Sequence, residues 1–258
     1  MPANLEVLFA PAEFAALPAY DLSETVCVVF DILRATSTIV TALANGAAGV
    51  IPVAEIADAV ALRRERPDVL LAGEREGLRI RAAMSGGIDF DFGNSPRECI
   101  SPPDALNSIR GRTIVLTTTN GSRALRACIG AKSVLAGSFL NLTATAEHLK
   151  RIGARNIMLV CSGTGRQAAY EDVLGAGALA ALLEPLFSLE ETSDSATIAL
   201  RTYSQHRDNL VKAFNESRNG RRLLAIPELR DDIAWCATRD RYSIVVELRG
   251  EAMATIAG

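Results

Sequence analysis

The sequence predicts an α/β fold, a sandwich of mainly parallel strands with helices on both faces. Short β-branched runs alternate with alanine-rich helical stretches along most of the 258 residues. Strands separated by helices are typical of parallel sheets, because each parallel crossover needs roughly a dozen residues or more. Apolar residues make up 49% of the chain and charged residues 22%, the balance of a globular protein with a buried core. We expect a single unit over residues 1–258, with any boundary between two α/β lobes near residues 100–112.

Seven runs rich in apolar and β-branched residues are predicted strands, because such side chains fit a pleated, buried surface. The clearest is Thr-Val-Cys-Val-Val-Phe-Asp at 25–31, which is typical of a buried strand. In chain order the predicted strands cover residues 25–31, 49–53, 69–72, 113–116, 133–135, 156–161 and 242–248.

The segments between these strands predict helices. Residues 36–47 open on threonine and serine, which cap helix N-termini well, and residues 56–66 are amphipathic and stop before Pro67. Residues 74–103 contain repeated glycine and proline and are predicted to be mostly loop. The remaining predicted helices cover residues 122–128, 142–151 and 171–183, followed by a mainly helical region over 190–241.

Charge and composition exclude several classes of protein. The chain has 27 basic and 30 acidic residues and a formal net charge of −3, so it lacks the basic surface of a nucleic-acid binder. The longest apolar stretch, 173–183, is shorter than the ~20 residues that span a membrane. Residues 1–10 lack the basic start of a secretory signal. The odd number of cysteines, without a Cys-x-x-Cys pair, predicts reduced thiols in the cytoplasm: Cys27, Cys99, Cys128, Cys161 and Cys236.

Three of the predicted strands are followed by a polar turn and then by a helix. These turns cover residues 31–38, 117–123 and 162–166. Ligands of open α/β sheets bind at the carboxyl ends of the strands, and free backbone N–H groups at helix starts suit anions. Arginines within the turns favour an anionic ligand. The alternative is that threonine, serine and asparagine there serve only as helix caps.

Residues 163–168 fit the pattern Gly-x-Gly-x-x-Ala that binds dinucleotides. The acidic partner of that pattern is expected about 20 residues later, where Glu184 and Pro185 make an unsuitable context. A dinucleotide-dependent oxidoreductase is therefore an alternative reading of the chain, with weak support.

Several short motifs occur in order from about residue 25 to residue 240. They lie at 30–38 (Phe-Asp-Ile-Leu-Arg-Ala-Thr-Ser-Thr), 71–75, 92–96 (Phe-Gly-Asn-Ser-Pro), 117–123 (Thr-Thr-Thr-Asn-Gly-Ser-Arg), 137–141, 171–177 and 232–237. Together they resemble the 2-phosphosulfolactate phosphatases, the ComB family. The resemblance implies an α/β fold of its own type and a Mg²⁺-dependent phosphoric monoester hydrolase. Such an enzyme converts (2R)-2-phospho-3-sulfolactate to sulfolactate and phosphate, an early step toward coenzyme M.

Carboxylates at the predicted strand ends are the expected magnesium ligands, because Mg²⁺ prefers oxygen ligands. We expect Asp31, Glu74 and Asp172 near the metal, with Glu171 as a substitute. The same three carboxylates and Arg34 are the expected catalytic residues. Glu171 and Asp172 have an alternative role, since acidic residues also stabilise a helix N-terminus. Either Asp31 or a metal-bound water is the expected nucleophile, and Ser37 or Ser122 is a weaker third option.

The substrate that the resemblance implies carries a phosphate, a carboxylate and a sulfonate, and such a polyanion needs several cations and N–H donors. The expected substrate-binding residues lie in the polar turns and in the glycine-rich loop: Thr36, Ser37, Arg75, Asn94, Ser95, Thr119, Asn120, Gly121, Ser122, Arg123 and Arg166.

The expected partner is therefore a small anionic phosphoester, with neither nucleic acid nor membrane, and a homodimer is possible. Arg218, Arg221 and Arg222 in the helical C-terminal region are expected on a solvated face, with a lid or a subunit contact as alternatives. A binding protein for sulfonates or carboxylates, without catalysis, is the remaining alternative function.

Overall fold

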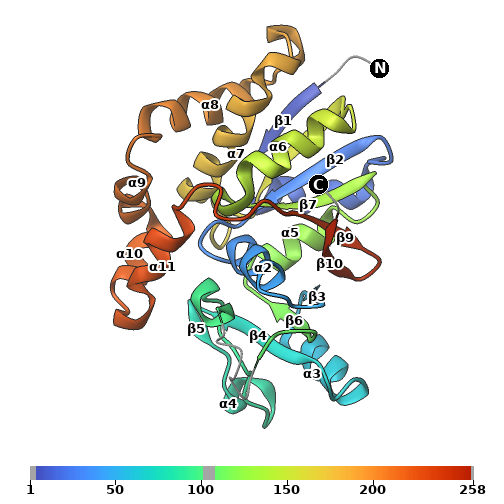
Figure 1. Cartoon of the computed structure of the whole chain (residues 1–258), viewed down its shortest axis with the longest axis vertical. Coiled ribbons are helices and arrows are strands. Elements are labelled where there is room, and N and C mark those ends of the chain that lie inside the picture. The colour runs from blue at the N-terminus through green and yellow to red at the C-terminus, as the bar shows by residue number, and fades with distance from the viewer. Residues whose placement is uncertain (1–3, 101–107, 257–258) are drawn as a thin grey trace.

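One ten-stranded sheet runs through residues 4–100 and 108–256, the part of the chain that the computed structural model describes (Figure 1). The strand order is β1-β8-β2-β7-β9-β10-β3-β6-β4-β5. The strands are β1 (Asn4–Leu8), β2 (Thr25–Phe30), β3 (Gly49–Val53), β4 (Leu70–Arg75), β5 (Leu78–Arg79), β6 (Thr113–Thr117), β7 (Ser133–Gly137), β8 (Asn156–Cys161), β9 (Val245–Arg249) and β10 (Ala252–Ile256).

The sheet consists of two parallel groups joined by an antiparallel hairpin. The strands β1, β8, β2 and β7 pair in parallel, as do β3, β6 and β4. The hairpin of β9 and β10 lies between the groups and joins each of them through a single antiparallel residue pair, Leu135 with Glu247 and Val50 with Met253. The predicted α/β sandwich of mainly parallel strands is confirmed.

Helices cover both outer faces and also fill the space between the two groups (Figure 1). They are α1 (Pro11–Phe14), α2 (Ala35–Ala44), α3 (Ile56–Glu65), α4 (Ala82–Ser85), α5 (Gly121–Ala127), α6 (Leu142–Arg151), α7 (Tyr170–Leu183), α8 (Asp194–His206), α9 (Leu210–Glu216), α10 (Arg218–Leu224) and α11 (Arg230–Cys236). Short 3₁₀ turns complete the chain at Leu17–Ala19, Pro96–Cys99, Phe139–Asn141, Glu184–Leu186, Leu189–Glu191 and Pro227–Leu229.

The alternation of side chains along β2 shows how the layers form. Successive side chains of a strand point to opposite faces. Val26, Val28 and Phe30 pack in the core beneath α6, α7 and α8, whereas Cys27 and Val29 pack in a second core with α2 and α5. That second core also contains side chains of β3, β4 and β6, so α2 lies between the two parallel groups. The position explains why every residue of α2 from Ala35 to Leu43 is buried.

The structure extends the sequence prediction at the sheet edges and in the glycine-rich loop. The short strands β1 and β10 were not predicted, because their five-residue runs contain polar or small residues and form through pairing with β8 and β9. The predicted loop over 74–103 contains β5 and α4. The lobe boundary was expected near residues 100–112, of which 101–107 lie outside the described residues. The strands β4 and β6, which lie before and after this region in the chain, pair with each other. None of the described helices is both long and apolar enough to cross a membrane.

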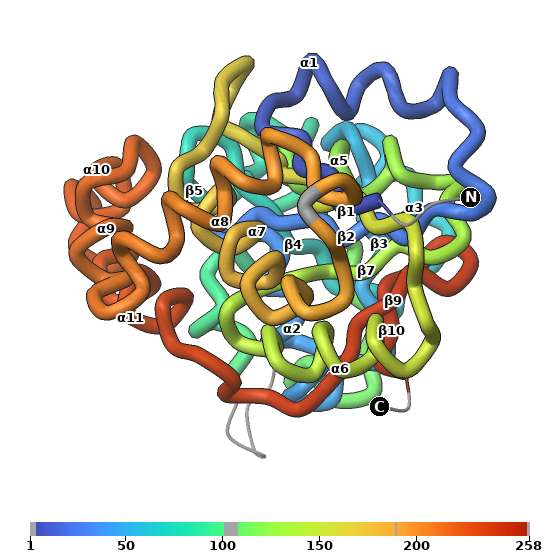
Figure 2. Tube along the Cα trace, turned by 90° about the horizontal axis from the view of Figure 1, so that it is seen from above, coloured from blue at the N-terminus to red at the C-terminus, as the bar shows by residue number. Residues whose placement is uncertain are grey.

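The helices α9, α10 and α11 gather at one end of the molecule beside β5, as Figures 1 and 2 both show. The region over 190–241 is thus mainly helical, as predicted. This end of the molecule also contains the loops that follow several strands, which brings the C-terminal helices to the predicted ligand-binding edge.

The packing of α7 depends on two glycines. A Cβ built at Gly175 would lie 2.9 Å from side-chain carbons of Phe30 and Ile32, and one built at Gly177 would overlap the carbonyl of Ala199 in α8. The absence of side chains at these positions lets α7 approach both β2 and α8. Since Glu171 and Asp172 lie in the first turn of α7, this close approach also fixes two carboxylates of the predicted site.

Replacement of Gly177 by alanine is expected to destabilise the protein. Helix propensity alone predicts a gain of up to about 1 kcal/mol for this change. The overlap with the Ala199 carbonyl instead predicts a loss of about 1–3 kcal/mol in the free energy of unfolding. Urea denaturation measures the difference, and a midpoint equal to or above that of the wild type would contradict the packing argument.

Candidate active site

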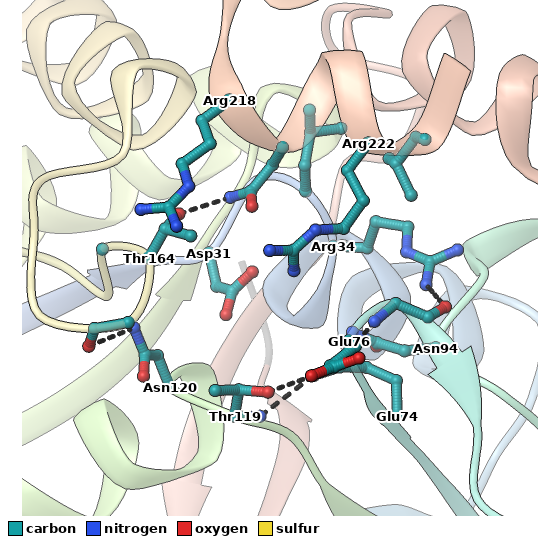
Figure 3. A pocket seen from close by; sticks show the side chains of 16 residues that line it. Asp31, Arg34, Glu74, Glu76, Asn94, Thr119, Asn120, Thr164, Arg218 and Arg222 are labelled. Carbon is teal, nitrogen blue, oxygen red and sulfur yellow. Dashed lines mark hydrogen bonds between the residues drawn. The ribbon is translucent and has the colours of Figure 1, made fainter. Parts of the chain in front are cut away.

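A cavity of about 190 Å³ opens where the loops after several strands meet α10 (Figure 3). Asp31 follows β2, Gly163 and Thr164 follow β8, and Thr119 follows β6. The β4–β5 hairpin and α10 complete the wall. Strands of both parallel groups therefore direct their carboxyl ends to one place. The three polar turns of the sequence meet there, because the accumulated twist of the sheet turns the second group toward the first.

Asp31 lies at the centre of this cavity, at the end of β2. Its Oδ1 accepts a hydrogen bond of 3.0 Å from the backbone N–H of Ala35, and its own N–H donates to Thr36 Oγ1. A Cβ at Gly121 would overlap Asp31 Oδ2, so only glycine leaves room for the carboxylate beside α5. Asp31 is partly exposed. A carboxylate in this position can contact a ligand in the cavity.

The carboxyl of Asp31 is a weaker acid than an ordinary aspartate. Its pKa is raised to about 6, mainly by removal from water and in smaller part by the nearby charges of Glu74 and Glu171, while hydrogen bonds from Ala35 and Ser162 oppose the shift. Raised pKa values of this kind are common at functional sites, because ionisable groups are buried there and placed close to like charges.

Asp172 lies beneath the cavity and does not line it. Its Oδ1 accepts from the N–H of Ile32 at 2.8 Å, and its Oδ2 accepts from the N–H of Gly163 at 3.0 Å and from Ser162 Oγ at 3.1 Å. Burial raises the pKa of Asp172 well above its ordinary value, and the charge of Asp31 adds to the shift. The carboxylate therefore joins the loop after β2 to the loop after β8.

Glu171 is buried beside Asp172 and also lies off the cavity wall. Its Oε1 accepts a hydrogen bond of 2.6 Å from Asn219 Nδ2 of α10. Burial raises the pKa of Glu171, and the neighbouring Asn219 and Ser217 partly offset that shift. Its visible role is to connect α7 with α10.

Glu74 lines the cavity from the β4 side, across from α10. Its Oε1 accepts from both the N–H and the Oγ1 of Thr119, each at 3.0 Å, and its Oε2 accepts from the N–H of Gly77 at 2.8 Å. These bonds fix the carboxylate of β4 against the turn after β6. Glu76 follows at the tip of the β4–β5 hairpin with a positive φ of 57°, and it also lines the cavity.

Arg34 is held by a buried carboxylate that the sequence analysis did not name as a site residue. Its Nη1 donates to Asp232 Oδ2 of α11 at 2.7 Å, and its Nη2 donates to the carbonyl of Gly77 at 2.8 Å. Asp232 Oδ1 also accepts from Ser95 Oγ at 2.7 Å. Asp232 thus positions Arg34 and the loop that carries Asn94.

Six of the predicted site residues line the cavity, and the others lie around it. The lining residues are Asp31, Arg34, Glu74, Asn94, Thr119 and Asn120. Of the others, Gly121 contacts Asp31, and Thr36, Ser37, Ser95 and Ser122 use their hydroxyls in the loops beneath.

Three predicted arginines point elsewhere. Arg75 donates to the carbonyl of Glu74 and to Thr117 Oγ1, and burial lowers its pKa. Arg123 forms an exposed ion pair with Glu55, and Arg166 is exposed and does not line the cavity.

The cations that do line the cavity include two that were expected on a solvated face. Arg218 and Arg222 of α10 reach toward it from the side opposite Glu74 (Figure 3). All three arginines are exposed, as expected, but Arg218 and Arg222 also line the cavity, whereas Arg221 does not. The local sequence contains no signal for the orientation of a helix this short. One clue could have pointed to Arg218 and Arg222. The helix α10 contacts α11, and residues 232–237 of α11 belong to the motifs of the resemblance.

The turn over 163–168 does not have the form of a dinucleotide-binding loop. Thr164 and Gln167 close it as a tight turn through two backbone hydrogen bonds, and α7 begins only at Tyr170. A cavity of about 190 Å³ is also small beside the roughly 300–1,000 Å³ of pockets for drug-sized ligands. The oxidoreductase alternative therefore has no support in the geometry.

The oxygen atoms of the cavity fit a magnesium ion. Asp31 and Glu74 line the same space, and Asn94 adds a buried Oδ1 that has no hydrogen-bond partner among the described residues. In residues 4–100 and 108–256 no three histidine, cysteine or acidic side chains are grouped as a metal site. Mg²⁺ needs only one or two protein carboxylates when water and a substrate phosphate supply the other ligands. Asp31 and Glu74 meet that requirement.

Comparison with known proteins places the chain in a family. The family model described as 2-phosphosulpholactate phosphatase matches residues 13–251. This chain belongs to the 2-phosphosulpholactate phosphatase family. The resemblance in the sequence motifs is thereby confirmed, and the cavity is the candidate active site of a phosphatase family.

Bacterial relatives match almost the whole chain. A protein of Pseudothermotoga lettingae is 38% identical over 242 residues, 93% of this chain and 94% of the relative. One of Caldanaerobacter subterraneus is 36% identical over 239 residues, 91% and 92% of the two chains. One of Thermotoga petrophila is 39% identical over 221 residues, 86% and 88%. Each is named as a probable 2-phosphosulfolactate phosphatase.

Replacement of Asp31 by asparagine is expected to stabilise the metal-free protein at neutral pH. The folded-state pKa of about 6 lies above the ordinary value of 3.8, so the folded state binds this proton more tightly than the unfolded state does. The wild type therefore loses stability as the pH rises from about 4 to about 6, whereas the neutral amide does not.

At pH 8 in EDTA we expect the asparagine variant to be more stable by about 1–3 kcal/mol, and we expect the difference to vanish below about pH 4. Denaturant titration at each pH measures it. A wild type that is the more stable protein at pH 8 would contradict the raised pKa of Asp31.

Proposed function

We propose that this protein is a Mg²⁺-dependent phosphatase that hydrolyses 2-phospho-3-sulfolactate, or a similar small acidic phosphoester, to sulfolactate and phosphate. The observation that carries the proposal is the position of Asp31. It is a partly exposed carboxylate at a strand end, in a small cavity with Glu74 on one side and the guanidiniums of α10 on the other. Membership of the family supports the reaction class.

Phosphoester hydrolysis needs neutralisation of charge, alignment of the nucleophile and a supported leaving oxygen. Asp31 and Glu74 would hold the metal, which when bound neutralises phosphoryl charge and orients the reacting oxygens. Arg34 presents its guanidinium at the wall while Asp232 and Gly77 fix it in place. The N–H groups at the start of α2 lie next to Asp31, so the backbone there favours negative charge.

Asp31 serves the reaction in either of two ways. It attacks phosphorus directly, or it holds a proton taken from the attacking water. Both roles need the ionised carboxylate near the substrate, and both fit its partial exposure at the end of β2. Ser37 and Ser122 are less suitable as nucleophiles, since both are buried and hydrogen-bonded within the loops.

We also place the reaction in the cytoplasm, because all five cysteines are free thiols buried in the fold. Homodimer formation stays a prediction from the general frequency of symmetric dimers, and light scattering on the purified protein tests it.

Phosphate release from 2-phospho-3-sulfolactate tests the proposed function. We expect release with Mg²⁺ and its loss in EDTA, with 2-phospholactate and phosphoglycolate as comparison substrates. Asp31→Asn should lower turnover by at least ~100-fold, because either role of the carboxylate is lost. The matched control is Asp208→Asn, since Asp208 is a fully exposed aspartate outside the cavity.

Release only from the comparison substrates would retain the phosphatase and exclude the sulfolactate substrate. No release from any of them, together with thermal stabilisation by sulfolactate, would favour the binding protein without catalysis. Near wild-type turnover in Asp31→Asn would remove Asp31 from the mechanism.

A further inference from the structure

Two arginines of α10 lie one helical turn apart on the side that faces the cavity. Residues three and four apart share a helix face, and all three arginines of α10 are exposed. Arg218 and Arg222 also line the cavity, whereas Arg221 does not. In Figure 3 the side chain of Arg222 extends from α10 toward Asp31, and that of Arg218 lies beside Thr164. They line the cavity together with Glu74 and Glu76, and Arg222 packs against the β4–β5 hairpin, where a Cβ built at Gly77 would lie 3.6 Å from its Cδ.

Specific contacts fix α10 in this orientation. Asn219 Nδ2 donates to Thr164 Oγ1 and to Glu171 Oε1, each at 2.6 Å. Ser217 caps the helix by accepting from the N–H of Gly220 at 2.9 Å, and a Cβ at Gly220 would overlap the carbonyl of Phe214 in α9. The two guanidiniums are therefore presented by a docked helix, which lowers the entropic cost of binding an anion.

The α10 arginines differ from Arg34 in how their charge is used. Arg34 is neutralised by Asp232 and gives its second nitrogen to Gly77. Arg218 donates to the neutral amide of Gln167 at 3.2 Å. In the described part of the chain, no ion pair joins Arg218 or Arg222 to a carboxylate. Both guanidiniums are therefore available to an anion that enters the cavity.

The carboxylates of the cavity and its cations without an ion pair thus come from different elements. Asp31, Glu74 and Glu76 supply carboxylates from the strand loops, whereas α10 supplies guanidiniums. An oxyanion that binds directly to the protein is attracted to the α10 side and repelled by the other. The forked donors of arginine match the oxygens of a tetrahedral oxyanion.

We propose that Arg222 and Arg218 bind the sulfonate of the substrate and select it over phosphoesters that lack this group. The inference rests on the proposed function. The phosphoryl group then lies on the carboxylate side, where Asp31 and Glu74 are placed for the metal. The arginine pair becomes a specificity determinant that holds the part of the substrate that does not react.

The test compares two substrates across variants of neighbouring arginines. kcat/KM is measured for 2-phospho-3-sulfolactate and for 2-phospholactate, which lacks only the sulfonate, with the wild type, Arg222→Ala, Arg218→Ala and the control Arg221→Ala. We expect Arg222→Ala to lower kcat/KM for the sulfonated substrate by about 10- to 100-fold, as for a lost hydrogen bond to a charged group.

For 2-phospholactate we expect a change of less than about threefold in Arg222→Ala, since it has no group to lose. Arg218→Ala should show the same selectivity with a smaller loss, and Arg221→Ala should match the wild type on both substrates. Equal losses on the two substrates would overturn the proposal, because the helix would then hold the phosphoryl group or the carboxylate. No loss on either substrate would overturn it as well.

A binding measurement separates this proposal from the proposed function. Sulfolactate should raise the melting temperature of the wild type and of Arg221→Ala more than lactate does, and Arg222→Ala should lose that difference. This result without turnover of any phosphoester would retain the sulfonate site and reject the phosphatase. Turnover with equal stabilisation by sulfolactate and lactate would retain the phosphatase and reject the sulfonate site.

Discussion

The hydrogen bonds to Asp172 are the constraint on which the active-site geometry depends. A single buried carboxylate accepts from Ile32 in the loop after β2 and from Ser162 and Gly163 in the loop after β8. These loops carry Asp31 and the turn that contacts α10. Because Asp172 lies in the first turn of α7, its position depends in turn on the close packing of that helix at Gly175 and Gly177. The geometry of the site therefore depends on the packing of the core.

This arrangement concentrates negative charge at a cost in stability. Burial raises the pKa values of Asp31, Glu171 and Asp172, and the charge of Glu171 adds to the shifts of Asp31 and Asp172. A fold selected for stability alone would replace some of these carboxylates with neutral groups, as natural proteins do away from functional sites. On the proposed function, the carboxylate at the end of β2 is required by the chemistry, and those at the start of α7 hold the loops and α10 around it.

Local sequence was sufficient for residues whose position follows from the strand pattern. Asp31, Thr119 and Asn120 were predicted because polar residues directly after buried strands meet at one edge of a parallel sheet. Glu74 was predicted at the end of its strand for the same reason. The roles of Arg218, Arg222 and Asp232 depend on how the C-terminal helices dock, and docking is decided by contacts with residues far away in the chain. Asp172 shows an intermediate case, since its helix was predicted but not the donors that occupy both of its oxygens.

On the proposed function, the arrangement of charge in the cavity links the need for Mg²⁺ to the orientation of the substrate. Three carboxylates and three guanidiniums line the space, but Asp232 already neutralises Arg34, so the uncompensated cations lie on α10 alone. A substrate with phosphate, carboxylate and sulfonate groups would meet repulsion at Asp31 and Glu74 unless a divalent cation lay between. Asp31 and Glu74 are thus suited to a phosphoryl group that binds through a metal ion. The arginines of α10 are suited to an anionic group that binds the protein directly. On the proposed function, the same division that makes Mg²⁺ necessary also determines which end of the substrate reacts.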